Sequence, residues 1–590
     1  MMMSELQTAS SGRLSRTGLL AILILLLIHL TVCLHTAARM SVTNDEFWHI
    51  PVGLRTLQEW RFDHDRLNPP VARCLAALPL LVGGVDAGTT AADEDKEAIG
   101  DAFAAANREH YSHVVWLSRL VPSVLSTLTA AAIARLAFRM SGQPAALAGT
   151  ALWCFSPNAI AHGSLATTDV PAAFFGVLVV VFLHRFAERA SAKRATAFGL
   201  LLGLAQAVKF TNVLLLFCAP LLFAAFRYGG QRRNDLSRKR LIALWTGSLV
   251  IALFALNAAY LFRGTGRTMD GYAFQSQILQ RVQEMSGPFG SIPIPLPADY
   301  LLGLDQQRHI MEGGHPVFLD GVWRFEGGFR DYFAKAVWYK MPHATQLICL
   351  LGVLQIFAGG NSVQRWQRLA ILLPAVLLFS IASLSSMQLG IRYLLPAFPF
   401  VFLNAALLFP KRLADLRLRH LLIVLLFCLL PLSLRHHPHH IPYFNELAGG
   451  PADGHLHLLD SNVDWGQGLL ELRDYLERQD VNQPFLAYFG AVAPRDLGIR
   501  FRVPPKADLP HVLWPRIEPG LYAVSRNFAY GRPGIVRNEF GHETAVNAYE
   551  YKHLTLHETE MTIGHCIEII RVTAAAADLR PLDEPAPEER

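Results

Sequence analysis

The chain has 590 residues, of which 52% are apolar and only 17% are charged, and its mean hydropathy is +0.28. Soluble domains carry roughly 25% charged residues, so this chain has too few charges to cover the apolar surface of a soluble protein. The composition excludes a disordered chain and a coiled coil, and the slight net charge of +6 excludes a nucleic-acid binder that works through bulk charge. We therefore expect an integral membrane protein without a nucleic-acid partner.

A membrane-spanning helix needs about 20 mostly apolar residues. About eleven segments of the sequence approach this pattern, which predicts an α-helical polytopic membrane protein. Lys209 and Asn212 divide the fifth segment from the sixth, since these two would otherwise form one long apolar run. The predicted spans cover residues 18–35, 113–134, 143–161, 170–187, 195–209, 211–227, 241–262, 344–358, 369–386, 393–410 and 420–434.

Arginine and lysine residues indicate how the chain is oriented. They gather before the first span and in alternate short loops, as in a protein whose N-terminus is cytoplasmic. The clusters include Arg13, Arg16, Arg135, Arg139, Arg185, Arg189, Arg232, Arg238, Arg365, Arg368, Lys411 and Arg417. A cleavable signal peptide over 13–38 is the alternative for the first span, and its loss would leave the outer side unchanged.

Three stretches on the predicted outer side are too long to be simple connectors. Loops 36–112 and 263–343 belong to a membrane domain of residues 1–434, and the third stretch is 435–590. This last part alternates apolar runs with Pro and Gly, which predicts a small α/β domain outside the membrane, with a disordered tail from Asp583.

Cysteine and histidine give no sign of a metal centre. The seven cysteines are scattered without a CxxC pair, which excludes a disulfide framework and a zinc module. The tract His436–His440 resembles a metal-binding run, but it directly follows the last span, where we expect a polar turn. We therefore assign no metal site and no cofactor, and the sequence leaves a requirement for a divalent metal open.

Charged residues at the outer ends of the spans form the candidate site. Asp45 and Glu46 follow the first span, and Thr43 and Glu46 have the spacing of a capping box that starts a helix. Asp169 opens the fourth span. Three cations, Lys209, Lys340 and Arg392, lie at the same predicted level. Such cations suit a phosphate at the lipid surface, and a neighbouring carboxylate suits proton transfer.

Structural roles are the alternative for each of these residues. Acidic residues in a first helical turn commonly cap the helix, and Lys or Arg at span ends commonly anchor it at the interface. The presence of acidic and basic residues together at one membrane level favours a functional site. It predicts that Asp45, Asp169 and Arg392 line one outward cavity, and side chains dispersed to separate faces would contradict the assignment.

The order of these residues resembles the membrane glycosyltransferases of the GT-C fold. The likeness is greatest to the protein O-mannosyltransferase group (family 39) and its bacterial branch, which includes the lipid A aminoarabinose transferases. It rests on elements spread over nearly the whole chain. These are Asp45-Glu46, Pro69-Pro70-Val71-Ala72-Arg73, Thr168-Asp169-Val170-Pro171, Tyr332-Phe333 with Lys340-Met341-Pro342, Arg392-Tyr393-Leu394-Leu395-Pro396, and the bacterial elements Tyr443–Pro451, Asp460–Gln467, Leu521–Ser525 and Ile563–His565.

The resemblance implies an inverting transfer of a sugar from a polyprenyl-phosphate donor to an acceptor hydroxyl on the outer face of a bacterial plasma membrane. The acceptor would be a glycan, a lipid or a protein. Asp45 would be the general base, and Asp169 its neighbour in acceptor binding. Arg392, Lys340 and Arg73 would hold the leaving phosphate, with Glu46 as a helix cap and Lys209 in support.

Three departures from the family pattern limit the assignment. Asn68 precedes the Pro pair where many relatives have His or Lys, and loop 263–343 has no room for the β-trefoil domain of eukaryotic protein mannosyltransferases. Asp460 and Asp464 precede a predicted helix (Leu469–Leu476) and carry no catalytic assignment. Two other functions remain open, namely a transporter or flippase for a lipid-linked or anionic substrate, and an assembly protein that has lost catalysis.

Overall fold

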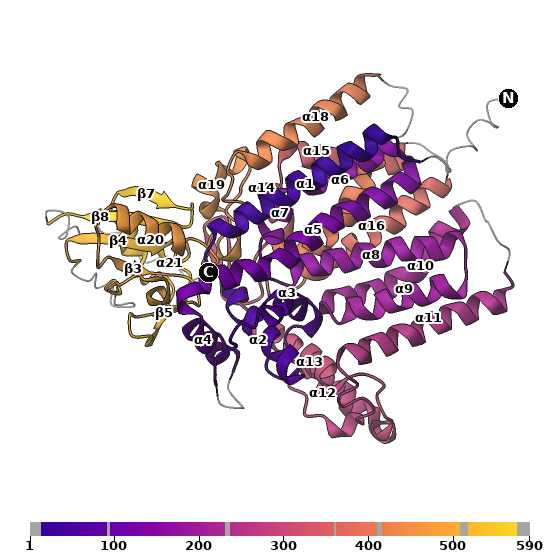
Figure 1. The fold of residues 1–590 in the computed structure, drawn as a ribbon, viewed down its shortest axis with the longest axis horizontal. Coiled ribbons are helices and arrows are strands. Elements are labelled where there is room, and N and C mark those ends of the chain that lie inside the picture. The colour runs from indigo at the N-terminus through magenta and orange to yellow at the C-terminus, as the bar shows by residue number, and fades with distance from the viewer. Residues whose placement is uncertain are drawn as a thin grey trace.

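The computed structural model describes residues 13–90, 95–229, 236–358, 362–409, 416–507 and 517–574. The predicted disordered tail from Asp583 and most of the acidic piece Ala91–Glu97 lie outside these residues. A bundle of long helices makes up most of the molecule, and a smaller part with strands covers one end of it (Figure 1). The predicted helical membrane protein with a small C-terminal α/β domain is therefore confirmed.

Six described helical segments are long and apolar enough to cross a membrane. Each of the eleven predicted spans is helical for most of its length. Only six of the described helical segments have the length and hydropathy of a membrane span, so the other crossings stay predictions. The six segments are α1 (Arg16–Arg39), Arg108–Ser141 with α5 (Tyr111–Ser141), α8 (Asp169–Glu188), Phe210–Gly229 with α10 (Leu214–Gly229), α11 (Arg238–Ala259) and α16 (Ser362–Ser383).

The other bundle helices are shorter. The predicted span 143–161 is broken near Ser156, and the run 195–227 is interrupted around Lys209, as its polar residues predict. These helices are α6 (Gln143–Cys154), α7 (Pro157–Gly163), α9 (Ala192–Gln206), α15 (His343–Ala358), α17 (Phe398–Ala406) and α18 (Leu416–Leu434).

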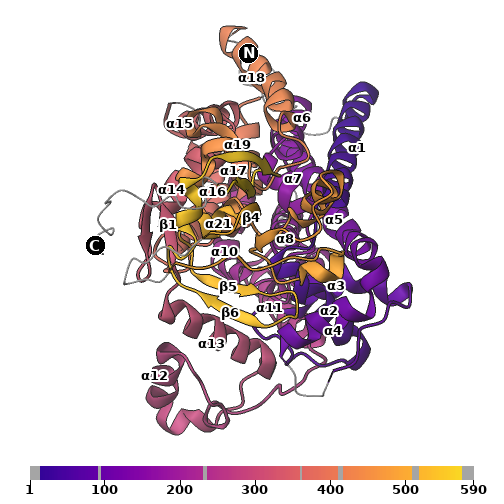
Figure 2. The same ribbon diagram turned by 90° about the vertical axis from the view of Figure 1, so that its left-hand side faces the viewer.

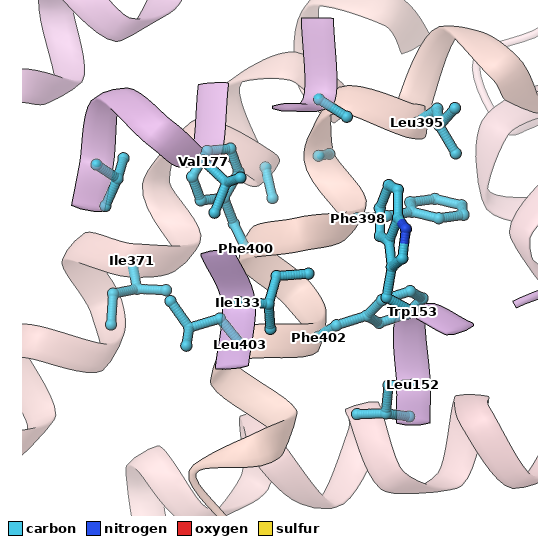
Figure 3. Packing of buried hydrophobic residues seen from close by; sticks show 14 of the residues in the cluster. Ile133, Leu152, Trp153, Val177, Ile371, Leu395, Phe398, Phe400, Phe402 and Leu403 are labelled. Carbon is cyan, nitrogen blue, oxygen red and sulfur yellow. The ribbon is translucent and has the colours of Figure 1, made fainter. Parts of the chain in front are cut away.

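Large apolar side chains and small residues together pack the bundle. Trp153 and Phe402 meet edge to face at 6.4 Å in a core that also holds Val177 and Ile371 (Figure 3). Gly203 of α9 faces α11 so closely that a Cβ atom there would lie 2.1 Å from the Ala252 carbonyl oxygen. Close helix contacts through small residues are the usual basis of packing between membrane helices.

The two long loops of the membrane domain fold into short elements. The first forms α2 (Asn44–Glu59), α3 (Pro70–Val82) and α4 (Lys96–Ala106). The second forms α12 (Gln277–Ser286), α13 (Ala298–Gly313), the antiparallel pair β1 (Val317–Leu319) and β2 (Val322–Arg324), and α14 (Tyr332–Lys340). Helices α2 and α4 lie at the same end of the bundle as the C-terminal strands (Figures 1 and 2).

A four-stranded sheet of order β3-β4-β8-β7 organises the C-terminal part. Strand β3 (Phe485–Ala487) runs parallel to β4 (Gly520–Ser525), while β8 (Ile567–Val572) is antiparallel to β4 and β7 (Thr559–Ile563). Helix α20 (Leu469–Arg478) shares an apolar core with this sheet and with α2. A separate hairpin joins β5 (Gly534–Arg537) and β6 (Glu543–Val546). The C-terminal part is thus packed directly on the first long loop of the membrane domain.

Candidate functional site

Helix α2 begins with the predicted capping box and fixes the position of Asp45. Glu46 accepts hydrogen bonds from the backbone nitrogen of Thr43 (3.0 Å) and from its hydroxyl (2.9 Å). It also accepts from Arg119 at Nε (2.8 Å) and Nη2 (2.7 Å), and both side chains are buried. Burial alone raises the pKa of Glu46, but Arg119 and the backbone donors reverse this and lower it. Glu46 is therefore a structural anion, as the sequence predicts.

Four of the predicted site residues form one ion cluster, defined here as the outer cluster: Asp45, Asp169, Lys209 and Arg392. Arg392 Nη1 lies 2.7 Å from Asp45 Oδ2 and 3.8 Å from Asp169 Oδ2. Lys209 Nζ donates to Asp169 Oδ1. The side chain of Asp45 is 22% exposed, whereas that of Asp169 is 1% exposed. A ligand can therefore reach Asp45 more easily than Asp169.

Breaks in regular helix bring these four residues together. Asp169 is the first residue of α8, and Lys209 has an extended backbone between α9 and the following 3-10 turn. Arg392 lies in the 3-10 segment Ile391–Ala397. Gly390 before it has φ of 150° and lies so close to Ser461 that a Cβ atom would be 2.5 Å from its hydroxyl. The irregular backbone lets side chains from distant parts of the chain meet.

The segment Asp460–Gln467 completes the site through Trp465, which the sequence analysis did not assign. Its ring lies 4.2 Å from the Arg392 guanidinium carbon, within the range of a cation–π contact. The Trp465 carbonyl accepts from the Asn44 backbone nitrogen (2.9 Å), directly before Asp45. The motif Asp460–Gln467 was visible in the sequence. Only the fold shows that it contacts both Arg392 and the beginning of α2, which carries Asp45.

His162 of α7 is a second residue that the sequence analysis missed. It is buried, its ring lies 6.0 Å from that of Trp465, and it interacts electrostatically with Asp169, Arg392, Lys340 and Lys209. Within the described residues its Nδ1 has no hydrogen-bond partner. No signal in the sequence marks this histidine, because it lies inside an apolar stretch without a recognisable motif.

Lys340 lies close to this site but its ammonium group points elsewhere. The side chain is buried and Nζ donates to the carbonyl oxygens of Ile441 and Asn462, each at 2.7 Å. It also lies 4.4 Å from the Phe444 ring. Burial lowers the pKa of Lys340 well below its usual value. These contacts tie α14 to the beginning of the C-terminal part.

Arg73 and Asn68 both contact Asp65 rather than the outer cluster. Arg73 Nη1 lies 3.0 Å from Asp65 Oδ2, and both side chains are almost fully buried. Asn68 Nδ2 donates weakly to the same carboxylate at 3.3 Å. His49 lies within electrostatic range of both Asp45 of the outer cluster and Asp65 beside Arg73. Burial lowers its pKa, and the two carboxylates oppose this shift. The roles of Arg73 and Lys340 as phosphate ligands stay predictions.

An apolar groove of about 340 Å³ leads toward the outer cluster. Tyr393 lines it, and the ring of Tyr393 lies 5.0 Å from the Arg392 guanidinium carbon and 5.7 Å from Lys209 Nζ. The remaining lining comes from the end of α16, the beginning of α10 and α13. It includes the apolar residues Val213, Leu214, Leu304, Met311, Leu378, Ile381 and Ala382, and also Gln307 and Arg308 of α13. The groove thus offers a largely apolar surface, and Tyr393 joins it to the two cations.

The histidine tract after α18 forms a chain of polar contacts. His437 Nε2 lies 2.7 Å from His35 Nδ1, and His437 Nδ1 lies 3.0 Å from His440 Nε2. In the described part of the chain, no three His, Cys, Asp or Glu residues are arranged to hold a metal ion.

The outer cluster balances two carboxylates against two cations. Arg392 and Lys209 can exchange a carboxylate partner for a phosphate, since both bind either anion through charge-assisted hydrogen bonds. Asp45 can accept a proton once Arg392 turns to such a ligand. The structure brings Asp45, Asp169 and Arg392 into contact and does not disperse them to separate faces. That they line one outward cavity stays a prediction.

Comparison with solved structures finds low sequence identity over long stretches. ArnT from Cupriavidus metallidurans, bound to undecaprenyl phosphate, is 12% identical, with a TM-score of 0.46 over 96% of this chain and 100% of that chain. The archaeal oligosaccharyltransferase AglB from Archaeoglobus fulgidus, in complex with an inhibitory peptide and a dolichol-phosphate, is also 12% identical. Its TM-score is 0.42, over 70% of this chain and 55% of that chain.

Comparison of sequences gives a match over part of the chain. No curated protein matches it. The model of the family described as dolichyl-phosphate-mannose-protein mannosyltransferase matches residues 111–260. This stretch runs from α5 to the end of α11 and contains Asp169 and Lys209. Over these residues, the predicted resemblance to the protein O-mannosyltransferase group is confirmed.

Proposed function

We propose that this chain is an inverting glycosyltransferase of the GT-C type that moves a sugar from a polyprenyl-phosphate donor to an acceptor hydroxyl. The observation that carries the proposal is the outer cluster, in which the accessible carboxylate of Asp45 lies 2.7 Å from Arg392. The next residue, Tyr393, lines the apolar groove. The family match over residues 111–260 supports the same reaction class.

The groove and the cations suit the two parts of such a donor. The polyprenyl chain would lie in the groove lined by Tyr393, and its phosphate would meet Arg392 and Lys209. We assign the phosphate to these two cations first, because Arg73 is paired with Asp65 and Lys340 with backbone carbonyls. Lys340 acts electrostatically on His162, which also interacts with Arg392 and Lys209.

In the reaction, the acceptor oxygen attacks the anomeric carbon as the bond from that carbon to the phosphate oxygen breaks. The acceptor proton passes to the carboxylate of Asp45, and the bonding electrons pass to the polyprenyl phosphate. The phosphate gains negative charge, which Arg392 and Lys209 stabilise where it develops. Asp169 keeps these two cations in place, since it contacts both and is itself buried.

The arrangement of the bundle supports an outward site. The outer cluster lies at the end of α1 and the beginning of α8, whereas Arg16, Arg139 and Arg185 lie at the opposite ends of α1, α5 and α8. By the positive-inside rule, these arginines support a cytoplasmic N-terminus and a C-terminal part on the outer side. The bacterial plasma membrane is proposed from the family resemblance alone.

The test compares wild type, Asp45→Asn and Asp63→Asn in purified membranes supplied with a panel of radiolabelled polyprenyl-phosphate sugars. Asp63 is the matched control, because it lies in the same outer loop and is partly exposed, with Arg61 as its partner at 2.9 Å. We expect Asp45→Asn to lower transfer by about 10²- to 10⁴-fold, the usual contribution of a general base, and Asp63→Asn to keep it.

Two outcomes would overturn parts of the proposal. Equal transfer by wild type and Asp45→Asn would remove Asp45 from the mechanism. Movement of an intact lipid-linked sugar across proteoliposomes, without release of the sugar to any acceptor or to water, would instead favour the transporter or flippase.

A further inference from the structure

A second polar cavity, of about 440 Å³, lies at the opposite end of the bundle from the outer cluster. It opens between the ends of α5, α15 and α17 and the beginning of α16, and its polar lining is formed by Gln355, Gln364, Arg365, Gln367 and Arg368. From Arg368 to the end of α16 at Ser383 the helix rises about 22 Å, at 1.5 Å per residue. The outer cluster lies beyond that far end, because Arg392 follows α16 in the chain.

Arg368 is the unusual residue of this cavity, because its charge is buried among neutral groups. It is 8% exposed, and it donates from Nε and Nη2 to Asn404 and from Nη2 to the Gly352 carbonyl (2.9 to 3.1 Å). A further bond runs from Nη1 to the Gln355 side chain. Among the described residues no carboxylate pairs with Arg368. One of its five N–H groups stays available.

Arg365 and Arg368 give the described lining of the cavity a charge of +2, and this lining contains no acidic residue. Arg365 is exposed and has no carboxylate partner in the described part of the chain. Glutamine amides beside the two guanidinium groups supply further N–H donors. Buried or clustered cations without an acid are costly unless an anion neutralises them, and guanidinium groups bind phosphate oxygens in a fixed fork geometry.

Exposed apolar residues beside the cavity indicate where the anion comes from. Trp366 and Phe357 flank the polar residues and are 67% and 68% exposed. Aromatic side chains at the end of a membrane helix lie at the level of the lipid headgroups. Basic pockets between membrane helices at that level commonly bind acidic headgroups.

We propose that this cavity binds the phosphate group of an anionic lipid in the leaflet opposite to the outer cluster, with Arg368 and Arg365 as its ligands. The site is independent of the proposed transfer reaction. It would hold the ends of α15, α16 and α17 together from the side of the membrane that the catalytic residues do not reach.

The test measures lipid binding to the purified full-length protein by native mass spectrometry, with phosphatidylglycerol as the anionic probe and phosphatidylcholine as the neutral one. The variants are Arg365→Gln and Arg368→Lys. The matched control is Arg240→Gln, because Arg240 is an exposed arginine at the same end of the bundle and does not line the cavity.

We expect each cavity variant to bind phosphatidylglycerol about tenfold more weakly, which corresponds to about 1.4 kcal/mol, and Arg240→Gln to bind as wild type does. Displacement of the lipid by inorganic phosphate, with the same dependence on the two arginines, would support the site and identify a soluble phosphate as a competing source. Wild-type affinity in Arg365→Gln would overturn the proposal, and this exposed position decides the test even if Arg368→Lys does not fold.

Discussion

Glu46 and Arg119 offer the sharpest test of how the outer loop is anchored. The two oxygens of Glu46 accept five hydrogen bonds, from Arg119 Nε and Nη2, from the Ala166 backbone nitrogen, and from the backbone nitrogen and hydroxyl of Thr43, at 2.7 to 3.0 Å. Glu46→Gln keeps the shape of the side chain but exchanges one accepting oxygen for a donating NH₂ group. At least two donors then lose their acceptor.

The cost follows from the burial of the pair. The Glu46 and Arg119 side chains are 0% and 1% exposed, so the substitution leaves an uncompensated cation away from water. Breaking such a buried pair costs about 3–5 kcal/mol. We expect Glu46→Gln to lower the apparent Tm in detergent by several degrees, measured by tryptophan fluorescence or by size-exclusion chromatography after heating.

Glu59→Gln is the matched control, because Glu59 ends the same helix, is 40% exposed in its side chain and contacts only His64 (3.0 Å) among the described residues. It should change Tm little, since exposed pairs contribute about 0–1 kcal/mol. A double variant with Arg119→Gln should lose less than the sum of the single variants. Equal Tm values for Glu46→Gln and Glu59→Gln would refute the anchoring argument.

Two further predictions concern buried titratable groups outside the membrane spans. Burial raises the pKa of Asp464 from 3.8 to about 7. The folded state therefore holds this proton more tightly than the unfolded state, and the stabilisation by Asp464 is full below about pH 4. It is lost as the pH rises through about 7, by up to about 4 kcal/mol. Asp464→Asn should flatten this part of the dependence of Tm on pH, and an unchanged slope would contradict the assignment. Lys340→Met should lower Tm by removing the donor to two buried carbonyls, at about 1–3 kcal/mol each. A Lys340→Met variant with wild-type Tm but no transfer would instead indicate a direct role at the phosphate.

Local patterns in the sequence were enough to predict much of this architecture. Apolar runs of spanning length predicted helices that the structure contains, because such runs have no other stable state in lipid. The break at Lys209 and Asn212 was also visible, since polar groups interrupt the apolar run there. The capping box of Thr43 and Glu46 depends on residues three positions apart, so it too was within reach of the sequence.

The partners of the charged side chains depended on the tertiary structure. The sequence showed Lys340 as a cation at the level of Arg392, and the family resemblance added Arg73. Nothing in the sequence indicated that Arg73 pairs with Asp65 or that Lys340 binds the carbonyls of Ile441 and Asn462. A cation binds whichever acceptor the fold brings within about 3 Å, and chain position does not fix that choice.

The contacts of Trp465 in the C-terminal part also depended on the tertiary structure. Its motif was recognisable, yet its contact with Arg392 joins residues 73 positions apart, and the backbone bond to Asn44 joins residues 421 positions apart. The sequence by itself predicted the apolar helices, the capping box of α2 and the kinds of residue available for a phosphate site. Packing of the α/β part on the first outer loop decided which of them meet, because long-range contacts form only once both surfaces are buried together.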